Sequence, residues 1–289
     1  MSLPPTVLVT GAGRGIGRAV VELFSDSGWR VVAGVRDVAA AQAAYAGCAG
    51  VLVTRLDVTD SESVRAGVAA AEGYADGALT CVVSNAGYAV LGAVEDADLA
   101  EVRAMFDTNF FGAAAVVQAA LPAMREAGRG SVVFVSSIGA RISNPLLGMY
   151  HASKYALSAM AEALAVECRA FGIHVVTIEP GMVDTDFPKA TRPTGALSRG
   201  EGPDLPLLAG LRAAFGDWRE RNPTSPHAVA LPVLAAAESP DGPFRIPVGT
   251  DAELLGRGRE TTIDDAAWQD ELLGFLAIDW PRRAAAPPR

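Results

Sequence analysis

The sequence predicts a single α/β unit in which an open, doubly wound parallel sheet of about seven strands carries helices on both faces. Short apolar runs alternate with longer helical stretches along the chain. A glycine-rich turn stands at the first junction between a strand and a helix. Of the 289 residues, 50% are hydrophobic, which is enough for a sizeable core in one large unit.

The strand and helix signals follow one another in a regular order. The predicted strands are residues 7–10, 30–35, 50–56, 79–84, 131–137, 173–179 and 244–248. The predicted helices begin at about Gly15, Val38, Ser61, Asp98, Tyr150 and Ser225. Strands this apolar, separated by helices, indicate a parallel sheet, so Ser84 and Ser137 should end their strands on one carboxyl edge.

The first strand leads into a turn, residues 11–17, whose members include Gly11, Arg14, Gly15, Ile16 and Gly17. Glycines let the backbone approach a pyrophosphate closely, and the following helix presents its free N–H groups and positive dipole end. A lone glycine-rich turn is a weak signal, but this one stands where an open parallel sheet holds a dinucleotide.

Tyr150 and Lys154 are four residues apart on a predicted helix, thirteen residues after Ser137. Both side chains should therefore share a face above the strand end. An ammonium one turn away favours the phenolate, and lowering a tyrosine pKa from ~10 to about 7 takes roughly 4 kcal/mol. Without further context such a pair is more often a rim aromatic and a solvated charge.

Taken in order, these motifs resemble those of the short-chain dehydrogenase/reductase family over residues 6–185. The matching positions are Thr10, Gly11, Gly15 and Gly17 for TGxxxGxG; Ser84, Asn85, Ala86 and Gly87 for NNAG; Asp57 and Val58 at the adenine; Asn109, Ser137, Tyr150 and Lys154 for the catalytic tetrad; and Pro180, Gly181, Val183 and Thr185 after the sixth strand. Two departures are Ser84 for the first Asn of NNAG and Glu179 where Asn is frequent.

The resemblance implies a Rossmann-like fold and hydride transfer between a nicotinamide and a carbonyl or alcohol carbon. Tyr150 would exchange a proton with the substrate oxygen, and Ser137 would form a hydrogen bond with that oxygen. Lys154 would hold the ribose and lower the pKa of the tyrosine, and Asn109 would keep a water molecule in a proton relay. In this family the helices matching residues 98–127 and 150–171 form a dimer interface, so a homodimer or homotetramer is expected.

The end of the second strand predicts NADP(H) in preference to NAD(H). NAD-dependent members place an acid there to accept from the ribose 2′-hydroxyl, whereas this chain has Val35 followed by Arg36. A guanidinium suits a 2′-phosphate, and Arg14 in the glycine turn could reach it from the other side. Either arginine taken alone would be interpreted as a solvated charge on the surface. Asp37 is close enough in sequence to be mistaken for the acid that binds the ribose in NAD-dependent members.

Residues 1–280 are predicted to form one catalytic domain, with 281–289 as a disordered tail. Residues 186–226 show no strand signal; Pro and Gly break the first half and an apolar stripe marks the second. Their place resembles the family's substrate lid, and an apolar lid implies an apolar small-molecule substrate.

Composition excludes several classes of partner. A net charge of −9 argues against nucleic acid and anionic membranes, and no uncharged apolar run reaches membrane-spanning length. The three cysteines lack a C-x-x-C spacing, which favours reduced thiols in the cytoplasm, and the three histidines show no metal-ligand spacing.

Three rival functions make different demands on the sequence. An epimerase or dehydratase of the extended branch has two residues between its first glycines, whereas three separate Gly11 from Gly15. A serine hydrolase needs G-x-S-x-G, which neither Ser136 nor Ser137 provides. A non-catalytic NAD(P)-sensing regulator on the same fold stays open, because fold alone does not imply catalysis, although such a protein has no need of the tetrad.

Overall fold

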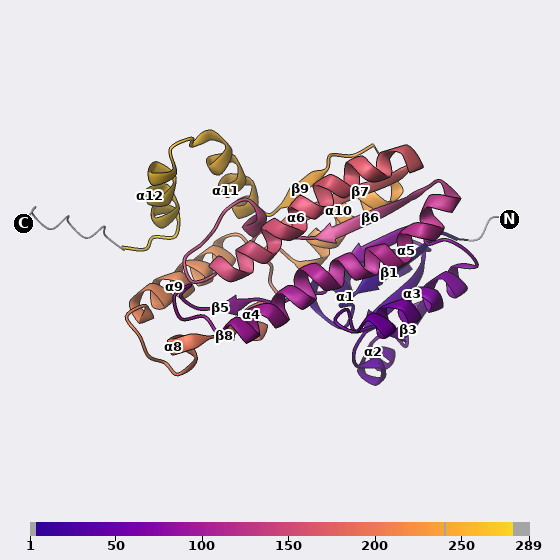
Figure 1. Cartoon of the computed structure of the whole chain (residues 1–289), viewed down its shortest axis with the longest axis horizontal. Coiled ribbons are helices and arrows are strands. Elements are labelled where there is room, and N and C mark those ends of the chain that lie inside the picture. The colour runs from indigo at the N-terminus through magenta and orange to yellow at the C-terminus, as the bar shows by residue number, and fades with distance from the viewer. Residues whose placement is uncertain (1–3, 240, 280–289) are drawn as a thin grey trace, which may run out of the picture.

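The seven predicted strands form one parallel sheet in the computed structural model, which describes residues 4–239 and 241–279 (Figure 1). The strands are β1 (Thr6–Thr10), β2 (Arg30–Val35), β3 (Val51–Arg55), β4 (Cys81–Ser84), β6 (Gly130–Val135), β7 (Ile173–Pro180) and β9 (Arg245–Val248). Their spatial order is β3-β2-β1-β4-β6-β7-β9, so the direction of winding reverses between β1 and β4. Ligands of open α/β sheets bind at such a switch point. The predicted fold class is confirmed.

Helices cover both faces of the sheet. They are α1 (Gly15–Asp26), α2 (Val38–Ala44), α3 (Ser61–Ala75), α4 (Leu99–Phe106), α5 (Ala113–Ala127), α6 (Gly148–Cys168) and α10 (Pro226–Glu238). On one face Val68, Val116 and Leu157 bring α3, α5 and α6 into a single buried cluster with the strands. On the other face Val20 and Val229 do the same for α1 and α10.

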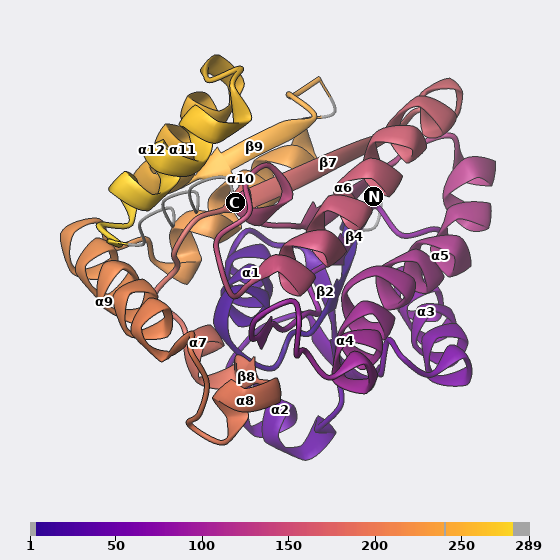
Figure 2. The same cartoon turned by 60° about the vertical axis from the view of Figure 1, so that its left-hand side comes forward.

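The predicted lid, residues 186–226, contains α7 (Phe187–Ala190), β8 (Arg192–Pro193), α8 (Gly195–Ser198) and α9 (Leu205–Arg221) (Figure 2). The expectation that it holds no strand is wrong, because β8 pairs in parallel with β5 (Val90–Leu91). A strand of two residues carries no local signal of its own. β8 forms because the segments around residues 90 and 192, which are distant in the sequence, lie side by side.

Two C-terminal helices, α11 (Thr250–Thr261) and α12 (Asp265–Phe275), were not predicted. They pack on the lid in a third apolar cluster, where Trp218 of α9 stacks on Phe275 of α12 with ring centroids 4.4 Å apart. The predicted domain, lid and tail boundaries stay predictions, and the tail at 281–289 lies outside the described residues.

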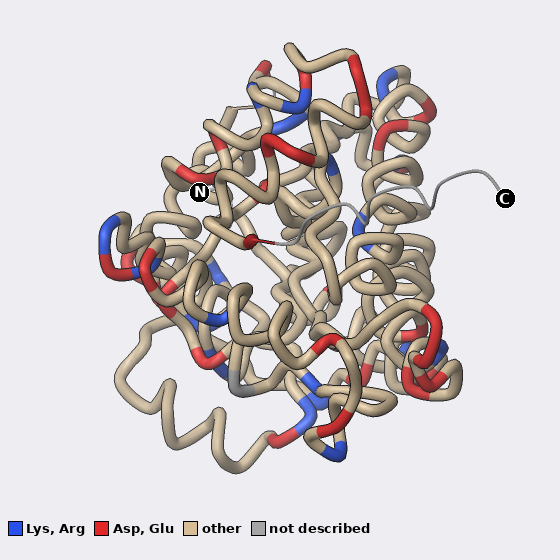
Figure 3. The backbone as a smooth tube through the Cα atoms, turned by 90° about the vertical axis from the view of Figure 1, so that its left-hand side faces the viewer, with Lys and Arg blue, Asp and Glu red and all other residues tan. Residues whose placement is uncertain are grey.

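The continuous helical run Leu99–Ala127 is long and apolar enough to cross a membrane by length and composition, and 44% of its apolar window is buried in the protein. A core helix passes the same test, so this is weak evidence for a membrane span. Figure 3 shows acidic and basic positions interspersed over the face it displays, in the part of the chain that the structure describes.

Candidate active site

The glycine turn packs tightly against the end of β4. Gly11 has a φ of +63°, and a Cβ built on it would lie 2.9 Å from the Cα of Ala86. A Cβ on Gly17 would lie 2.4 Å from the Gly11 carbonyl oxygen, so both positions require glycine. Ile16 packs behind the turn against the core.

Helix α1 begins at this turn with Arg14 at its N-cap position and no capping hydrogen bond from a side chain. Its first N–H groups therefore lack the usual side-chain acceptor and suit the oxygens of a diphosphate. The Cβ position of Gly15 faces the Cγ2 of Thr185 at 3.5 Å, so the segment after β7 closes over the turn. These features fit a dinucleotide cofactor.

Thr10 joins the ends of β1 and β4. Its hydroxyl oxygen accepts from the backbone N–H of Asn85 at 3.0 Å and of Ala86 at 3.2 Å. The Asn85 amide in turn donates to the carbonyl oxygens of Thr10 and Gly11. These bonds hold the predicted residues Asn85, Ala86 and Gly87 beside the glycine turn.

Asn109 lies in a π-helical segment, Asp107–Gly112, between α4 and α5. Its side chain is buried; Oδ1 accepts from the N–H of Tyr88 at 3.0 Å, and Nδ2 donates to the Tyr88 carbonyl at 2.9 Å and to Ser153 Oγ at 3.0 Å. A π-helical turn inside an α-helix is common at functional sites. Here the amide links the segment after β4 to α6.

Ser137 starts a short 3₁₀ turn and accepts from the N–H of Gly139 at 3.0 Å. The Tyr150 ring is 8% exposed, and burial raises the pKa of its phenol to about 12, while a hydrogen bond with Ser137 lowers it. Ser137 and Tyr150 are thus brought together, as the sequence predicts.

Lys154 is brought near by the same helix, and its predicted effect on the pKa of Tyr150 stays a prediction. Its ammonium donates to the Val135 carbonyl at 3.1 Å, and burial lowers its pKa to about 8. A Cβ on Gly87 would lie 3.6 Å from Lys154 Nζ and 3.1 Å from Asn109 Oδ1, so the backbone of Gly87 packs closely against both side chains.

The segment after β7 is anchored at both ends. The Gly181 N–H donates to the Val248 carbonyl at 3.0 Å, and Val183 pairs with Thr224. Asp251 fills the space that a Gly181 side chain would need and accepts from the Met182 N–H at 2.6 Å. Pro180, Gly181, Val183 and Thr185 therefore lie along the carboxyl edge of the sheet.

Asp57 and Val58 follow β3 at the same edge. Burial alone would raise the pKa of the Asp57 carboxyl, but hydrogen bonds from Thr59 and the charge of Arg36 outweigh it and lower the pKa. Val58 is buried, and its side chain lies 2.7 Å from the position of a Cβ on Gly112. This close approach brings the helix that carries Asn109 over the edge.

Arg14 and Arg36 are both exposed beside the glycine turn, whereas Val35 is buried. Neither guanidinium forms an ion pair with a carboxylate of the described residues. Asp37 is engaged as the N-cap of α2, where its carboxylate accepts from the Ala40 N–H at 3.0 Å.

Sequence reasoning missed two features of the site. Phe187 of the lid lies against the catalytic ring, with its centroid 5.9 Å from that of Tyr150. Glu179 was noted only as a departure, yet it is fully buried and binds two arginines. Its partners are 38 and 66 residues away, so no local motif could reveal them.

Residues 5–195 match the short chain dehydrogenase family. The chain belongs to this family. It is therefore an oxidoreductase that acts on the CH–OH/C=O couple, as predicted. The family match spans the glycine turn, the tetrad and the first part of the lid.

Individual family members extend the match to almost the whole chain. A 3-ketodihydrosphingosine reductase from Bacteroides thetaiotaomicron is 32% identical over 275 residues, which cover 95% of this chain and 99% of the relative. A short-chain dehydrogenase structure from Streptomyces avermitilis has a TM-score of 0.80 at 31% identity and covers 95% of this chain and 99% of its own. One from Burkholderia cenocepacia, in complex with NADP, has a TM-score of 0.73 at 26% identity, covering 93% and 98%.

Proposed function

We propose that this short chain dehydrogenase is an NADP(H)-dependent oxidoreductase that transfers a hydride between the nicotinamide and a carbonyl or secondary alcohol on an apolar small molecule. The observation that carries the proposal is the convergence of Asn109, Ser137, Tyr150 and Lys154 at the carboxyl edge of the sheet, next to a glycine turn that fits a diphosphate.

Each side chain of the tetrad has a separate task. The nicotinamide, when bound, supplies or accepts the hydride. Tyr150 donates a proton to the substrate oxygen or takes one from it, and Ser137 donates a hydrogen bond to that oxygen as negative charge develops. Lys154, which packs next to Gly87, would hold the ribose of the cofactor. Asn109 keeps α6 aligned with the segment after β4 and maintains a proton relay.

An apolar substrate is supported by the surroundings of Tyr150. Its ring belongs to a buried cluster with Ile138, Leu147 and lid residues such as Leu211. Burying apolar substrate surface there is favourable by about 25 cal/mol per Å². The similarity to a reductase of 3-ketodihydrosphingosine also supports an apolar carbonyl substrate.

The proposed preference for NADP(H) is supported by Arg14 and Arg36, both free of ion pairs to described residues, and by the use of Asp37 as a helix cap. The relative from Burkholderia cenocepacia is in complex with NADP. We expect Arg36→Ala to weaken NADPH binding by about 1.5–3 kcal/mol, the range for hydrogen bonds to charged groups, and to leave NADH binding nearly unchanged. Calorimetric titration of both cofactors measures this.

The matched control for Arg36→Ala is Arg30→Ala. Arg30 begins the same strand, β2, at its amino end, whereas Arg36 follows its carboxyl end, where the cofactor is proposed to bind. It should change neither cofactor's affinity. Equal losses for NADPH and NADH in the Arg36 variant would contradict the preference.

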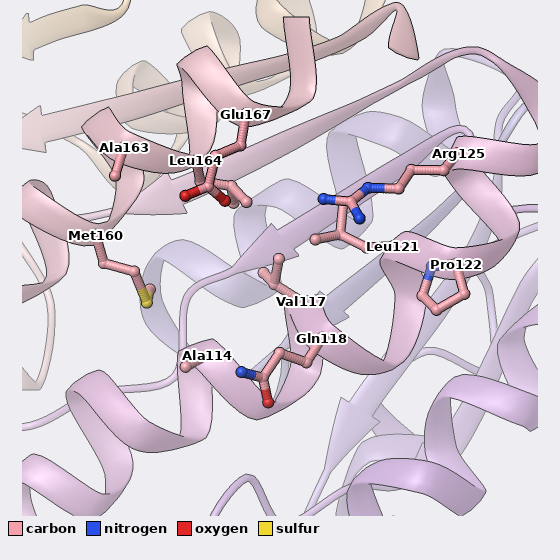
Figure 4. Close-up of a pocket in the computed structure, with 10 residues that line it drawn as sticks. All are labelled: Ala114, Val117, Gln118, Leu121, Pro122, Arg125, Met160, Ala163, Leu164 and Glu167. Carbon is pink, nitrogen blue, oxygen red and sulfur yellow. The ribbon is translucent and has the colours of Figure 1, made fainter. Parts of the chain in front are cut away.

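A self-associated, cytoplasmic enzyme completes the proposal. A groove of about 380 Å³ lies between α5 and α6; most of its lining is small or apolar, as at Ala114, Ala163 and Leu164, and Gln118, Arg125 and Glu167 complete it (Figure 4). Val166 beside it is 75% exposed, so this face suits a second copy of the chain. Cys48, Cys81 and Cys168 are all free, which is consistent with a reducing compartment.

The proposed function is tested by following NADPH oxidation with ketones and aldehydes graded in size and polarity. We expect turnover of apolar carbonyls and slower turnover with NADH. A protein that binds NADPH tightly but reduces nothing in the panel would instead be a cofactor-sensing regulator.

A further inference from the structure

Glu179 ends β7 immediately before Pro180 and is fully buried. Its Oε2 accepts from Arg141 Nε at 2.5 Å, and its Oε1 accepts from Arg245 Nη1 at 3.1 Å. A buried carboxylate is tolerated only when it is paired in this way. The two arginines come from different elements, so the carboxylate joins them at the carboxyl edge.

Arg141 divides its nitrogens between two acids. While Nε binds Glu179, Nη1 donates to Glu260 Oε1 of α11 at 2.6 Å. A Cβ on Gly256 of α11 would lie 3.4 Å from the Ile138 side chain and 3.7 Å from Arg141 Nη1, so α11 packs directly on this region. The planar guanidinium can hold two carboxylates on opposite sides, which an ammonium cannot reproduce.

Arg141 is also the last residue of the turn that begins with Ser137, the 137–141 turn. The Ala140 N–H donates to the Ser137 carbonyl at 3.0 Å, and the Arg141 N–H donates to the Ile138 carbonyl at 2.8 Å. The turn is therefore short and closed on itself. A displacement of its last residue is transmitted to Ser137 at its start.

We propose that Arg141 is a positioning residue that fixes the Ser137 hydroxyl against Tyr150 by holding the 137–141 turn between Glu179 and Glu260. This rests on the proposed function, in which Ser137 and Tyr150 share the substrate oxygen. Misplacing a group by about 1 Å can cost on the order of 100-fold in rate, so a fixed turn matters to catalysis.

A pH profile separates this role from simple stabilisation of the fold. Two influences act on the pKa of Tyr150: burial raises it, and the hydrogen bond with Ser137 lowers it. Neither Arg141 nor Glu179 acts on that pKa directly. Two titratable groups lie beside the phenol on its own helix: Lys154, which binds the Val135 carbonyl, and His151, whose Nδ1 lies 3.0 Å from the Gly139 carbonyl of the 137–141 turn.

The experiment compares Arg141→Lys with Arg245→Lys as a matched control, because both arginines bind Glu179 but only Arg141 belongs to the turn. For Arg141→Lys we expect a loss of kcat of about 10-fold or more, NADPH affinity within about two-fold of wild type, and a rise of roughly one pH unit in the kinetic pKa of kcat/KM. Arg245→Lys should leave the kinetic pKa unchanged. Glu260→Gln, at an exposed partner, should shift it in the same direction by less.

A double substitution tests whether the effect passes through Ser137. In a Ser137→Ala background, Arg141→Lys should not shift the kinetic pKa further. A full additional shift in that background, or equal shifts in the Arg141 and Arg245 variants, would overturn the proposal.

One readout does not depend on turnover. Hydrogen exchange of the Gly139 N–H, which donates to Ser137 Oγ, should be faster in Arg141→Lys and unchanged in Arg245→Lys. If the wild type reduces no carbonyl but this exchange pattern holds, the proposed function fails while the positioning of Ser137 stands. Active wild type with unchanged exchange and pKa in Arg141→Lys would overturn the positioning role alone.

Discussion

His151 stands next to Tyr150 on α6, and its imidazole is buried. Nδ1 lies 3.0 Å from the Gly139 carbonyl, which it can reach only as a donor, while Nε2 is buried with no partner among the described residues. Burial lowers the pKa of His151 to about 4. The neutral imidazole therefore supports the turn that carries Ser137, and adding a proton would bury an unpaired charge.

This titration predicts a dependence of stability on pH. The ordinary histidine pKa is 6.5, so the unfolded chain binds this proton more tightly than the folded protein. The contribution of neutral His151 to the free energy of unfolding is complete above pH 6.5, the pKa of the histidine in the unfolded chain. It is lost as the pH falls toward 4, and the loss is at most about 3 kcal/mol. Urea unfolding at pH 7 and at pH 4.5 should show a smaller decrease for His151→Asn than for wild type. Equal decreases in the two proteins would contradict this assignment.

Residue identities of the tetrad were predictable, but the interactions among them were not. Tyr150 and Lys154 share a helix face, as their spacing requires, whereas the hydrogen bond of Lys154 with Val135 depends on how deeply α6 is buried. Glu179 shows the same limit, because the local sequence cannot reveal the distant arginines that neutralise it.

At the scale of elements, the lid is held down by a small set of polar contacts. The buried Thr194 accepts from the Asp98 N–H through Oγ1 at 2.9 Å and donates its own N–H to the Leu91 carbonyl at 2.9 Å. The backbone N–H of Ala196 donates to Asp96 at 2.6 Å. These bonds join the lid to the segment that follows Gly87.

Removing one of these contacts should loosen the lid without unfolding the protein. Thr194→Val keeps the shape of the side chain but leaves the Asp98 N–H without its acceptor, at a cost of about 1–3 kcal/mol. Hydrogen exchange of the lid amides should accelerate, while the exchange of the sheet stays unchanged. Thr191→Val, at a half-buried lid position whose hydroxyl donates to the Phe187 carbonyl within the lid, is the control and should behave as wild type. No acceleration in the Thr194 variant would show that the bond does not hold the lid.

The segment 186–226 stands out in the sequence by its Pro and Gly residues and its apolar stripe, and its role as a lid stays a prediction; its strand was not predicted. β8 has two residues, one of them a proline, and is defined by pairing with β5. Helices α11 and α12 were also missed, although they cover the same apolar cluster as α9. Elements of this kind form because tertiary contacts bury them, not because local propensity is strong.

For the molecule as a whole, the groove between α5 and α6 predicts self-association. Ala163→Arg would fill that groove with a long side chain and add a positive charge beside Arg125 and Glu167, and should shift the protein toward the monomer in sedimentation experiments. Ala69→Arg is the control, because Ala69 is an exposed alanine on α3, away from the groove. A wild-type monomer, or an unchanged assembly in the Ala163 variant, would contradict this interface.

The parallel character of the sheet follows from features that are visible in the sequence. Apolar runs at regular spacing, separated by amphipathic stretches, leave few alternatives to a parallel sheet covered on both faces. That arrangement brings Ser84, Ser137 and the glycine turn to one edge. How the lid and C-terminal helices close over that edge depends on contacts between distant segments, which periodicity does not encode.

The central claim, that Tyr150 transfers the proton in a nicotinamide-dependent carbonyl reaction, is tested most directly by Tyr150→Phe. This change removes the hydroxyl and little volume. With NADPH and the best carbonyl substrate of the wild type, kcat should fall at least about 100-fold, the usual scale for proton transfer, while NADPH affinity stays within a few-fold. A variant that keeps more than about a tenth of wild-type kcat, a barrier change below ~1.4 kcal/mol, would contradict the account.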